Sequence, residues 1–176
     1  MKIVNLFYLQ SKIRMMDIRI LVAQHVIDVM EGGNWTDVNL ADTIKDVSVE
    51  EATKRTAGSP NTIASLLHHL AYWNRVMIQR INGVKVEVPD INGFDVPDLK
   101  TDQDWGNLKA DLNTSAHELA DAIRNFDLER IAEPIVPGYS SAYKNLQGTV
   151  KHIHYHLGQI VILKKLAKKA EQVRFA

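Results

Sequence analysis

Cysteine is absent from this chain of 176 residues. The absence excludes disulfide bonds, thiolate metal sites and a cysteine nucleophile, so any metal ion has to be bound by histidine, aspartate or glutamate. A chain without cysteine also suits the reducing cytoplasm, which is the location that we expect for this protein.

An excess of charge of one sign is missing as well. The chain has 21 basic and 21 acidic side chains, which gives a formal net charge of zero. Nucleic acid and anionic membrane surfaces attract basic proteins, so this balance predicts neither as a partner. The lysines at 164, 165, 168 and 169 are more typical of a solvated helix end than of a nucleic-acid patch.

Long apolar runs are also missing. No stretch reaches the roughly 18 uninterrupted apolar residues that a membrane span requires. The N-terminal segment is apolar at first, but Gln10 and Lys12 interrupt it and no small-residue cleavage site follows, so no signal peptide is predicted.

The length predicts one domain that covers residues 1–176. Met15 and Met16 are alternative starts to Met1, and we expect residues 1–15 to be a poorly ordered extension.

Four segments have apolar residues at helical spacing. They cover residues 17–31, 59–83, 101–126 and 146–168. Ser59 is the expected N-cap of the second segment, and Thr101 with Asp104 forms a capping pair at the start of the third. The last segment is apolar on most sides, which is typical of a helix inside a bundle. The sequence therefore predicts an all-α four-helix bundle.

The connections between these segments carry weaker signals. A helical turn near residues 40–44 and a capping box at Ser48 and Glu51 predict short extra structure in the first connection. The second connection is rich in proline and glycine, and we expect a loop with a short extended piece at residues 84–88.

The decapeptide KHIHYHLGQI contains three histidines in five positions. His152 and His156 are four residues apart, so on a helix they project from one face and can reach the same metal ion. His154 lies about 200° around the helix from His152, where a hydrogen-bonded or surface histidine is expected.

A third ligand has to come from another helix. His69 lies in the apolar stripe of its helix, whereas His68 lies on the more polar side, so His69 is the better candidate. His25 also lies on a stripe that looks buried, and His117 looks exposed. A lone histidine on an apolar face is more often a core residue with one hydrogen bond. Three converging imidazoles are costly to bury unless a cation satisfies them.

Two stretches together resemble a known family. The first runs from Thr62 and Ile63 through LLHHL to Trp73, and the second is the HxxxHxGQI box from His152 to Ile160. They are similar to the DinB-like superfamily, which includes the bacillithiol-transferase-like proteins. The likeness covers the chain from about residue 17 to residue 165, and the HxxxHxGQI box is its most specific part.

The resemblance implies a fold, an assembly and a site. The fold would be a left-handed four-helix bundle of DinB-like type with an unusual helix order, commonly dimeric. A three-histidine site for a divalent metal would lie near one end of the bundle, with His69, His152 and His156 as ligands. Gly158 and Gln159 match the GQ pair of the family, which we interpret as close helix packing beside the site.

The resemblance favours an enzyme that uses zinc or nickel to transfer a low-molecular-weight thiol to a small electrophile. The alternatives are a metal-dependent hydrolase, a non-enzymatic metal-binding stress-response protein, and a bundle whose histidines are only packed. Tyr72, Tyr155 and Gln159 are close enough in sequence to the expected ligands to support them. Asn74 stands where many members of the family have an acidic residue, so no carboxylate role is expected there.

Overall fold

The computed structural model describes the backbone of residues 17–172 and the side chains of residues 17–168. Within these residues the regular structure is helical, and no β-strand forms, so the predicted all-α fold is confirmed. The elements are α2 (Ile18–Glu31), α3 (Leu40–Ile44), α4 (Val49–Thr53), α5 (Ile63–Ile81), α6 (Asp102–Arg124), the 3-10 helix η1 (Leu128–Arg130) and α7 (Ala142–Gln172). Residues 84–88, where we expected a short extended piece, form no β-strand, and the predicted extension of residues 1–15 lies outside the described residues.

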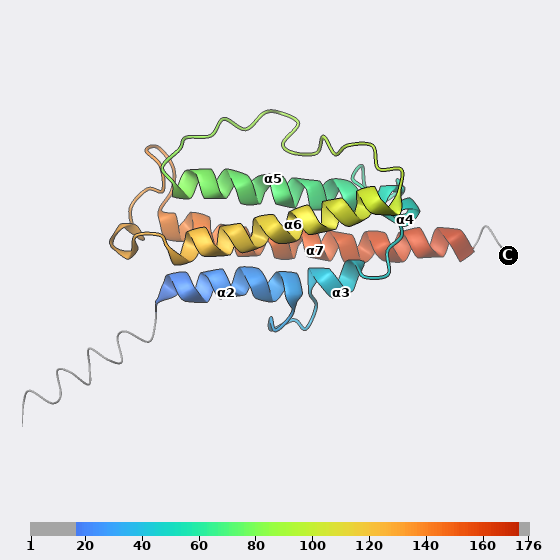
Figure 1. Cartoon of the computed structure of the whole chain (residues 1–176), viewed down its shortest axis with the longest axis horizontal. Coiled ribbons are helices and arrows are strands. Elements are labelled where there is room, and N and C mark those ends of the chain that lie inside the picture. The colour runs from blue at the N-terminus through green and yellow to red at the C-terminus, as the bar shows by residue number, and fades with distance from the viewer. Residues whose placement is uncertain (1–16, 173–176) are drawn as a thin grey trace, which may run out of the picture.

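The four long helices α2, α5, α6 and α7 form a bundle (Figure 1). Helix α6 packs against α2 and α5, and α7 packs against the same two helices. The colours of Figure 1 show that α2 and α7 run in one direction whereas α5 and α6 run in the other. Because α5 and α6 are parallel, the chain has to return along the whole bundle between them. Residues 82–101 make this return, and we call them the crossover loop.

The helix starts follow side-chain capping. Our expectation that Ser59 caps α5 is wrong. The oxygen of Thr62 accepts a hydrogen bond from the backbone N–H of Ser65, and Oγ of Ser65 accepts one from Thr62 in return. This reciprocal pair satisfies two free N–H groups, so the helix begins three residues later than expected. The predicted pair of Thr101 and Asp104 caps α6 in the same reciprocal way.

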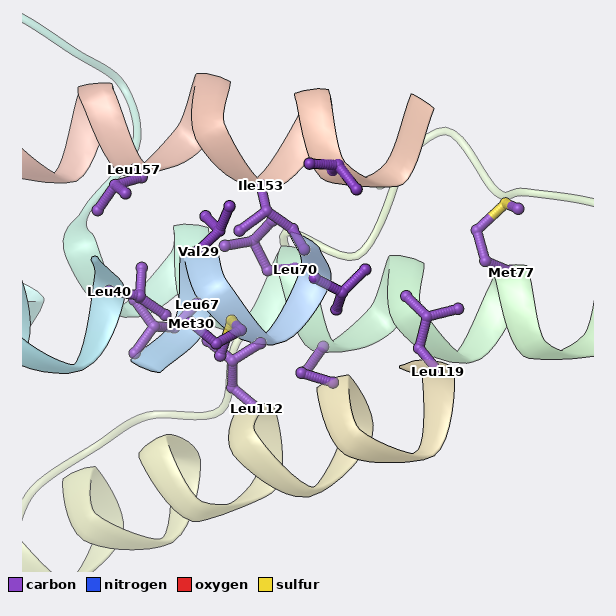
Figure 2. Packing of buried hydrophobic residues seen from close by; sticks show 14 of the residues in the cluster. Val29, Met30, Leu40, Leu67, Leu70, Met77, Leu112, Leu119, Ile153 and Leu157 are labelled. Carbon is purple, nitrogen blue, oxygen red and sulfur yellow. The ribbon is translucent and has the colours of Figure 1, made fainter. Parts of the chain in front are cut away.

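Apolar side chains from all four long helices meet along the axis of the bundle. Figure 2 shows the contributions of Val29 and Met30 from α2, Leu40 from α3, Leu67, Leu70 and Met77 from α5, Leu112 and Leu119 from α6, and Ile153 and Leu157 from α7. Complete burial of one such side chain stabilises the fold by about 1.5–3 kcal/mol. Helix α7 is not covered on all sides, however, because among the described residues α2 and α5 are the only long helices that it packs against, and Ile162 remains 59% exposed.

The described helices include none that is both long enough and apolar enough to cross a membrane. Polar side chains interrupt the core at a few places, among them His69, Asn74, Arg80 and His156. His69 and His156 lie between the antiparallel helices α5 and α7, whereas Asn74 of α5 donates a hydrogen bond to Oγ of Ser115 on α6.

Candidate metal centre

Three histidine side chains from α5 and α7 meet between these helices. Nε2 of His152 lies 3.1 Å from Nε2 of His69 and 3.0 Å from Nε2 of His156. One nitrogen from each ring lies within 4.8 Å of the other two. Three nitrogens on one tetrahedral zinc ion, each about 2.0–2.1 Å from the metal, would be about 3.3 Å apart. The two short distances at His152 are close to this value, and the three histidines form a group that could hold a metal ion.

Helix geometry accounts for this convergence. His152 and His156 are one turn apart on α7 and present their rings on the same face. His69 is opposite them on α5, the antiparallel neighbour, and is only 3% exposed, which confirms its predicted inward position. His156 is buried and His152 is half-buried, so the cluster is open to solvent mainly at His152.

The crossover loop contacts the ring of His69 at Nδ1, the nitrogen that faces away from the other two histidines. Nδ1 of His69 donates a hydrogen bond to the backbone oxygen of Asn92 at 2.7 Å. The side-chain oxygen of Asn92 accepts a second hydrogen bond, from Nε1 of Trp73 at 3.0 Å. Because one loop residue contacts both side chains, the ring of His69 and the indole of Trp73 are positioned together.

Gly93 allows the loop to approach this closely. Its φ is +75°, and a Cβ atom at this position would lie 2.6 Å from the ring of Tyr72. Tyr72, which we expected to support the ligands, therefore packs against the loop at Gly93. Its ring contacts Trp73 and none of the three histidines. The motif that contains Asn92 and Gly93 indicates a turn, but nothing in the sequence shows which helix that turn would contact.

The other two expected supporting residues contact His156 directly. Nδ1 of His156 donates a hydrogen bond to Oε1 of Gln159 at 2.7 Å. Tyr155 packs edge-on against the same ring, with 4.9 Å between ring centroids, although it is 64% exposed. The neighbouring Gly158 is exposed and makes no close helix contact, so that interpretation of the GQ pair is wrong. Gly158 lies two residues from His156, and therefore on the opposite, outward side of α7.

Burial keeps these imidazoles neutral. Desolvation lowers the pKa of His69 to about 4, although the bond to Asn92 opposes this shift. Desolvation and the neighbouring histidines lower the pKa of His152 to about 4. The pKa of His156 is lowered by burial as well, although its hydrogen bond to Gln159 opposes this shift. Neutral imidazole is the form that binds a metal ion.

The hydrogen-bond donors and acceptors of the cluster do not balance without a cation. Because Nδ1 of His69 and Nδ1 of His156 carry the protons, Nε2 of each ring has only a lone pair. Nε2 of a neutral His152 has at most one proton, so it can donate to only one of its two neighbours. The other contact would place two lone pairs against each other. A divalent cation bound by these rings would accept all three lone pairs, and so the donor set fits a metal ion.

Aromatic rings cover the cluster. The ring of Phe94, from the crossover loop, stacks on His69 with 4.1 Å between centroids and 14° between planes. Trp73 lies edge-on to both His69 and His152. These rings exclude water from one side of the cluster, whereas a cavity of about 310 Å³ opens on another side, beside His152.

The remaining histidines lie away from the cluster. Nδ1 of His68 bonds the backbone oxygen of Gly93, and Nδ1 of His154 bonds that of Val150, as expected for residues on other helix faces. His117 is exposed and bonds Glu31. Our expectation that His25 is buried is wrong, because α2 turns its other side, with Val22, Val26 and Val29, towards the core.

Comparison with known protein families identifies the family of this chain. The model of the DinB superfamily matches residues 34–160, a segment that includes all three clustered histidines. Neither a curated protein nor a solved structure matches the chain. The family match covers well over half of the sequence and agrees with the helical bundle, so the chain belongs to the DinB superfamily.

Proposed function

We propose that the protein is a metal-dependent enzyme in which His69, His152 and His156 hold one zinc or nickel ion. The observation that carries this proposal is the close approach of Nε2 of His152 to Nε2 of both His69 and His156. Neutral imidazoles suit both metals. Three protein ligands leave coordination positions open, which is typical of catalytic rather than structural sites.

The reaction that we propose is the transfer of a low-molecular-weight thiol to a small electrophile. The thiol gives its proton to solvent water, its sulfur forms a bond to carbon, and the leaving group departs from that carbon with its electron pair. A bound divalent cation supplies the acidity that ionises a thiol near neutral pH. The resemblance to the bacillithiol-transferase-like proteins favours this reaction over hydrolysis.

The residues of this chain would position and protect the reacting groups. The carbonyl of Asn92 and the amide of Gln159 orient two of the rings so that each lone pair on Nε2 points inward. Phe94 and Trp73 exclude water from the cluster. The cavity beside His152 is the open approach for a substrate.

Metal analysis of protein purified without a histidine tag tests the site. We expect about one divalent ion per chain, and a large loss of metal in each of the variants His69→Ala, His152→Ala and His156→Ala. His154→Ala is the matched control, because His154 lies two residues from both His152 and His156 and its Nδ1 bonds the backbone oxygen of Val150 instead. Unchanged metal content in the first three variants would refute the site.

A panel of thiols and substrates tests the reaction. Metal-loaded protein is incubated with bacillithiol, glutathione or cysteine and a reactive electrophile, and in parallel with hydrolysable esters and amides. We expect metal-dependent conjugation of a thiol. Metal-dependent hydrolysis alone would replace the transferase with a hydrolase. Metal binding without either reaction would indicate a non-enzymatic metal-binding protein.

We also propose that the protein works as a homodimer in the cytoplasm. The neighbouring helices α2 and α7 expose large apolar side chains, among them Leu21 and Ile162, which subunit contacts commonly cover. The absence of cysteine suits a reducing compartment. Light scattering should give about twice the 19.9 kDa of one chain, and a mass near 20 kDa would contradict the dimer.

A further inference from the structure

The cavity beside the three histidines is lined by residues of α5, by Ser140 in the loop before α7, and by the beginning of α7. Its volume is about 310 Å³, which is at the lower end of the range for small-molecule sites. The lining includes Trp73, Met77, Ser140, Lys144, Asn145 and His152, and it contains no aspartate or glutamate. His152 belongs to both the cavity and the cluster, so a molecule in this cavity lies next to the candidate metal centre.

Two cations at this cavity lack an acidic partner. Lys144 is exposed, lines the cavity and makes no ion pair within the described part of the chain. Arg80 is only 9% exposed, and its buried Nε has no hydrogen-bond partner there. Its Nη1 reaches no nearer partner than the sulfur of Met77, at 4.0 Å.

The guanidinium of Arg80 is packed directly behind the cavity wall. Its Cζ lies 5.2 Å from the ring centroid of Trp73 and 4.8 Å from that of Tyr139. Trp73 and Met77, which both contact Arg80, line the cavity, and Tyr139 precedes the lining residue Ser140. The positive charge is therefore buried against the cavity rather than on a remote face.

Four other arginines of the described chain have carboxylate partners, although they are more exposed. These are Arg19 with Asp17, Arg75 with Asp111, Arg124 with Asp121 and Arg130 with Glu133. A buried cation without a counter-charge is costly, because desolvation is not repaid by attraction to a partner. An anion bound in the cavity would provide the missing charge.

We propose that this cavity binds the carboxylate of a small organic substrate. Lys144 would contact the carboxylate directly, and Arg80 would add positive electrostatic potential from behind Trp73 and Met77. The hydroxyl of Ser140 and the amide of Asn145 can donate hydrogen bonds to the carboxylate. The reacting end of the molecule would then lie towards His152. This last point depends on the proposed function, whereas the affinity for a carboxylate does not.

The test compares two thiol probes of the same chain length, one ending in a carboxylate and the other in a neutral alcohol. The full-length protein, metal-free and zinc-loaded, is titrated with 3-mercaptopropionate and with 3-mercapto-1-propanol, and binding is followed by NMR chemical shifts. We expect the carboxylate to bind at least about tenfold more tightly than the alcohol in both forms, with the largest shifts at Asn145 and Gly148. Equal affinity for the two probes would overturn the proposal.

Variants assign the preference to the cavity. Lys144→Met should weaken the binding of the carboxylate by about three- to fivefold and leave that of the alcohol unchanged. Lys165→Met, an exposed lysine further along the same helix, is the matched control and should change neither. Arg80→Met should abolish most of the preference, and Arg80→Lys should restore part of it. If circular dichroism shows that Arg80→Met does not fold, the comparison of Lys144→Met with Lys165→Met decides whether the carboxylate binds in this cavity.

Metal content separates this proposal from the proposed function. Lys144→Met should bind the same amount of metal as the unmodified protein. If the protein binds no metal but still prefers the carboxylate, the proposed function fails and the anion site stands. If metal binds at the three histidines without any carboxylate preference, the anion site fails alone. An equal loss of carboxylate affinity in Lys165→Met would also contradict it.

Discussion

The backbone oxygen of Asn92 lies 2.7 Å from Nδ1 of His69, although 23 residues separate them in the chain. The contact arises because α5 carries the chain one way along the bundle and the crossover loop returns beside it (Figure 1). The same arrangement stacks Phe94 on the ring of His69. A long loop that connects two parallel helices thus becomes part of the candidate metal centre.

The loop gives a first prediction, for the variant Gly93→Ala. The added Cβ would lie 2.6 Å from Tyr72, and φ is +75°, so the loop has to shift and the oxygen of Asn92 moves away from His69. Loss of such an orienting partner typically lowers metal affinity by about 10–100-fold. The measurement is a competition titration against a chelator. Gly83→Ala is the control, because its φ is +82° but a Cβ there meets nothing within 4 Å. The same affinity in both variants would argue against a role of the loop.

A second prediction concerns Gln159, whose Oε1 accepts the proton of Nδ1 of His156. Gln159→Leu removes the acceptor but keeps a side chain of similar size. We expect metal affinity to fall by about tenfold or more, because the ring of His156 loses both its orientation and its preferred tautomer. Gln147→Leu, on the same helix and without a contact to the cluster, should leave the affinity unchanged. A loss confined to Gln147→Leu, or a loss in neither variant, would contradict the assignment.

A third prediction is the effect of pH on the metal-free protein. The pKa of His69 and that of His152 are lowered from 6.5 to about 4 by folding, so between these values the unfolded chain binds more protons than the native one. The free energy of unfolding therefore falls as pH falls through this range, and the stabilisation is fully present only above pH 6.5. Urea unfolding at pH 7 and pH 5, with a chelator present, measures the effect. Both pH values lie above the ordinary pKa values of aspartate and glutamate, so these side chains contribute little to the difference. His69→Phe should flatten this dependence, and equal stability at the two pH values would contradict the prediction.

A fourth prediction concerns the stability of the bundle. Nε1 of the buried Trp105 donates a hydrogen bond of 2.8 Å to the backbone oxygen of Val47, which connects α6 to the segment between α3 and α4. Trp105→Phe leaves this oxygen unpaired and should cost about 2 kcal/mol. For a chain of this size that loss lowers the melting temperature by about 4–8 °C. Trp35→Phe is the control, because Trp35 is 97% exposed. Similar melting temperatures for the two variants would show that the buried hydrogen bond contributes little.

The periodicity of the sequence was sufficient to predict the four long helices and the inward position of His69. It failed at the start of α5, where Ser59 and Thr62 both fit a cap and only Thr62 has a reciprocal partner. It failed for His25 because α2 has apolar residues on more than one side, and the choice of the buried side depends on its neighbours. Local pattern therefore predicts the presence of a helix more reliably than the direction that it faces.

Helical spacing alone places His152 and His156 on one face, because a turn of α-helix has the same geometry in any protein. The sequence also contains Asn92, Lys144 and Arg80, but nothing in their spacing relates them to these histidines. Their positions follow from the parallel pairing of α5 with α6 and from the packing of α5 against α7. Those contacts join residues far apart in the chain. The hydrogen bond from His69 to the carbonyl of Asn92, and the position of Lys144 and Arg80 at the cavity, therefore form only when the helices pack together.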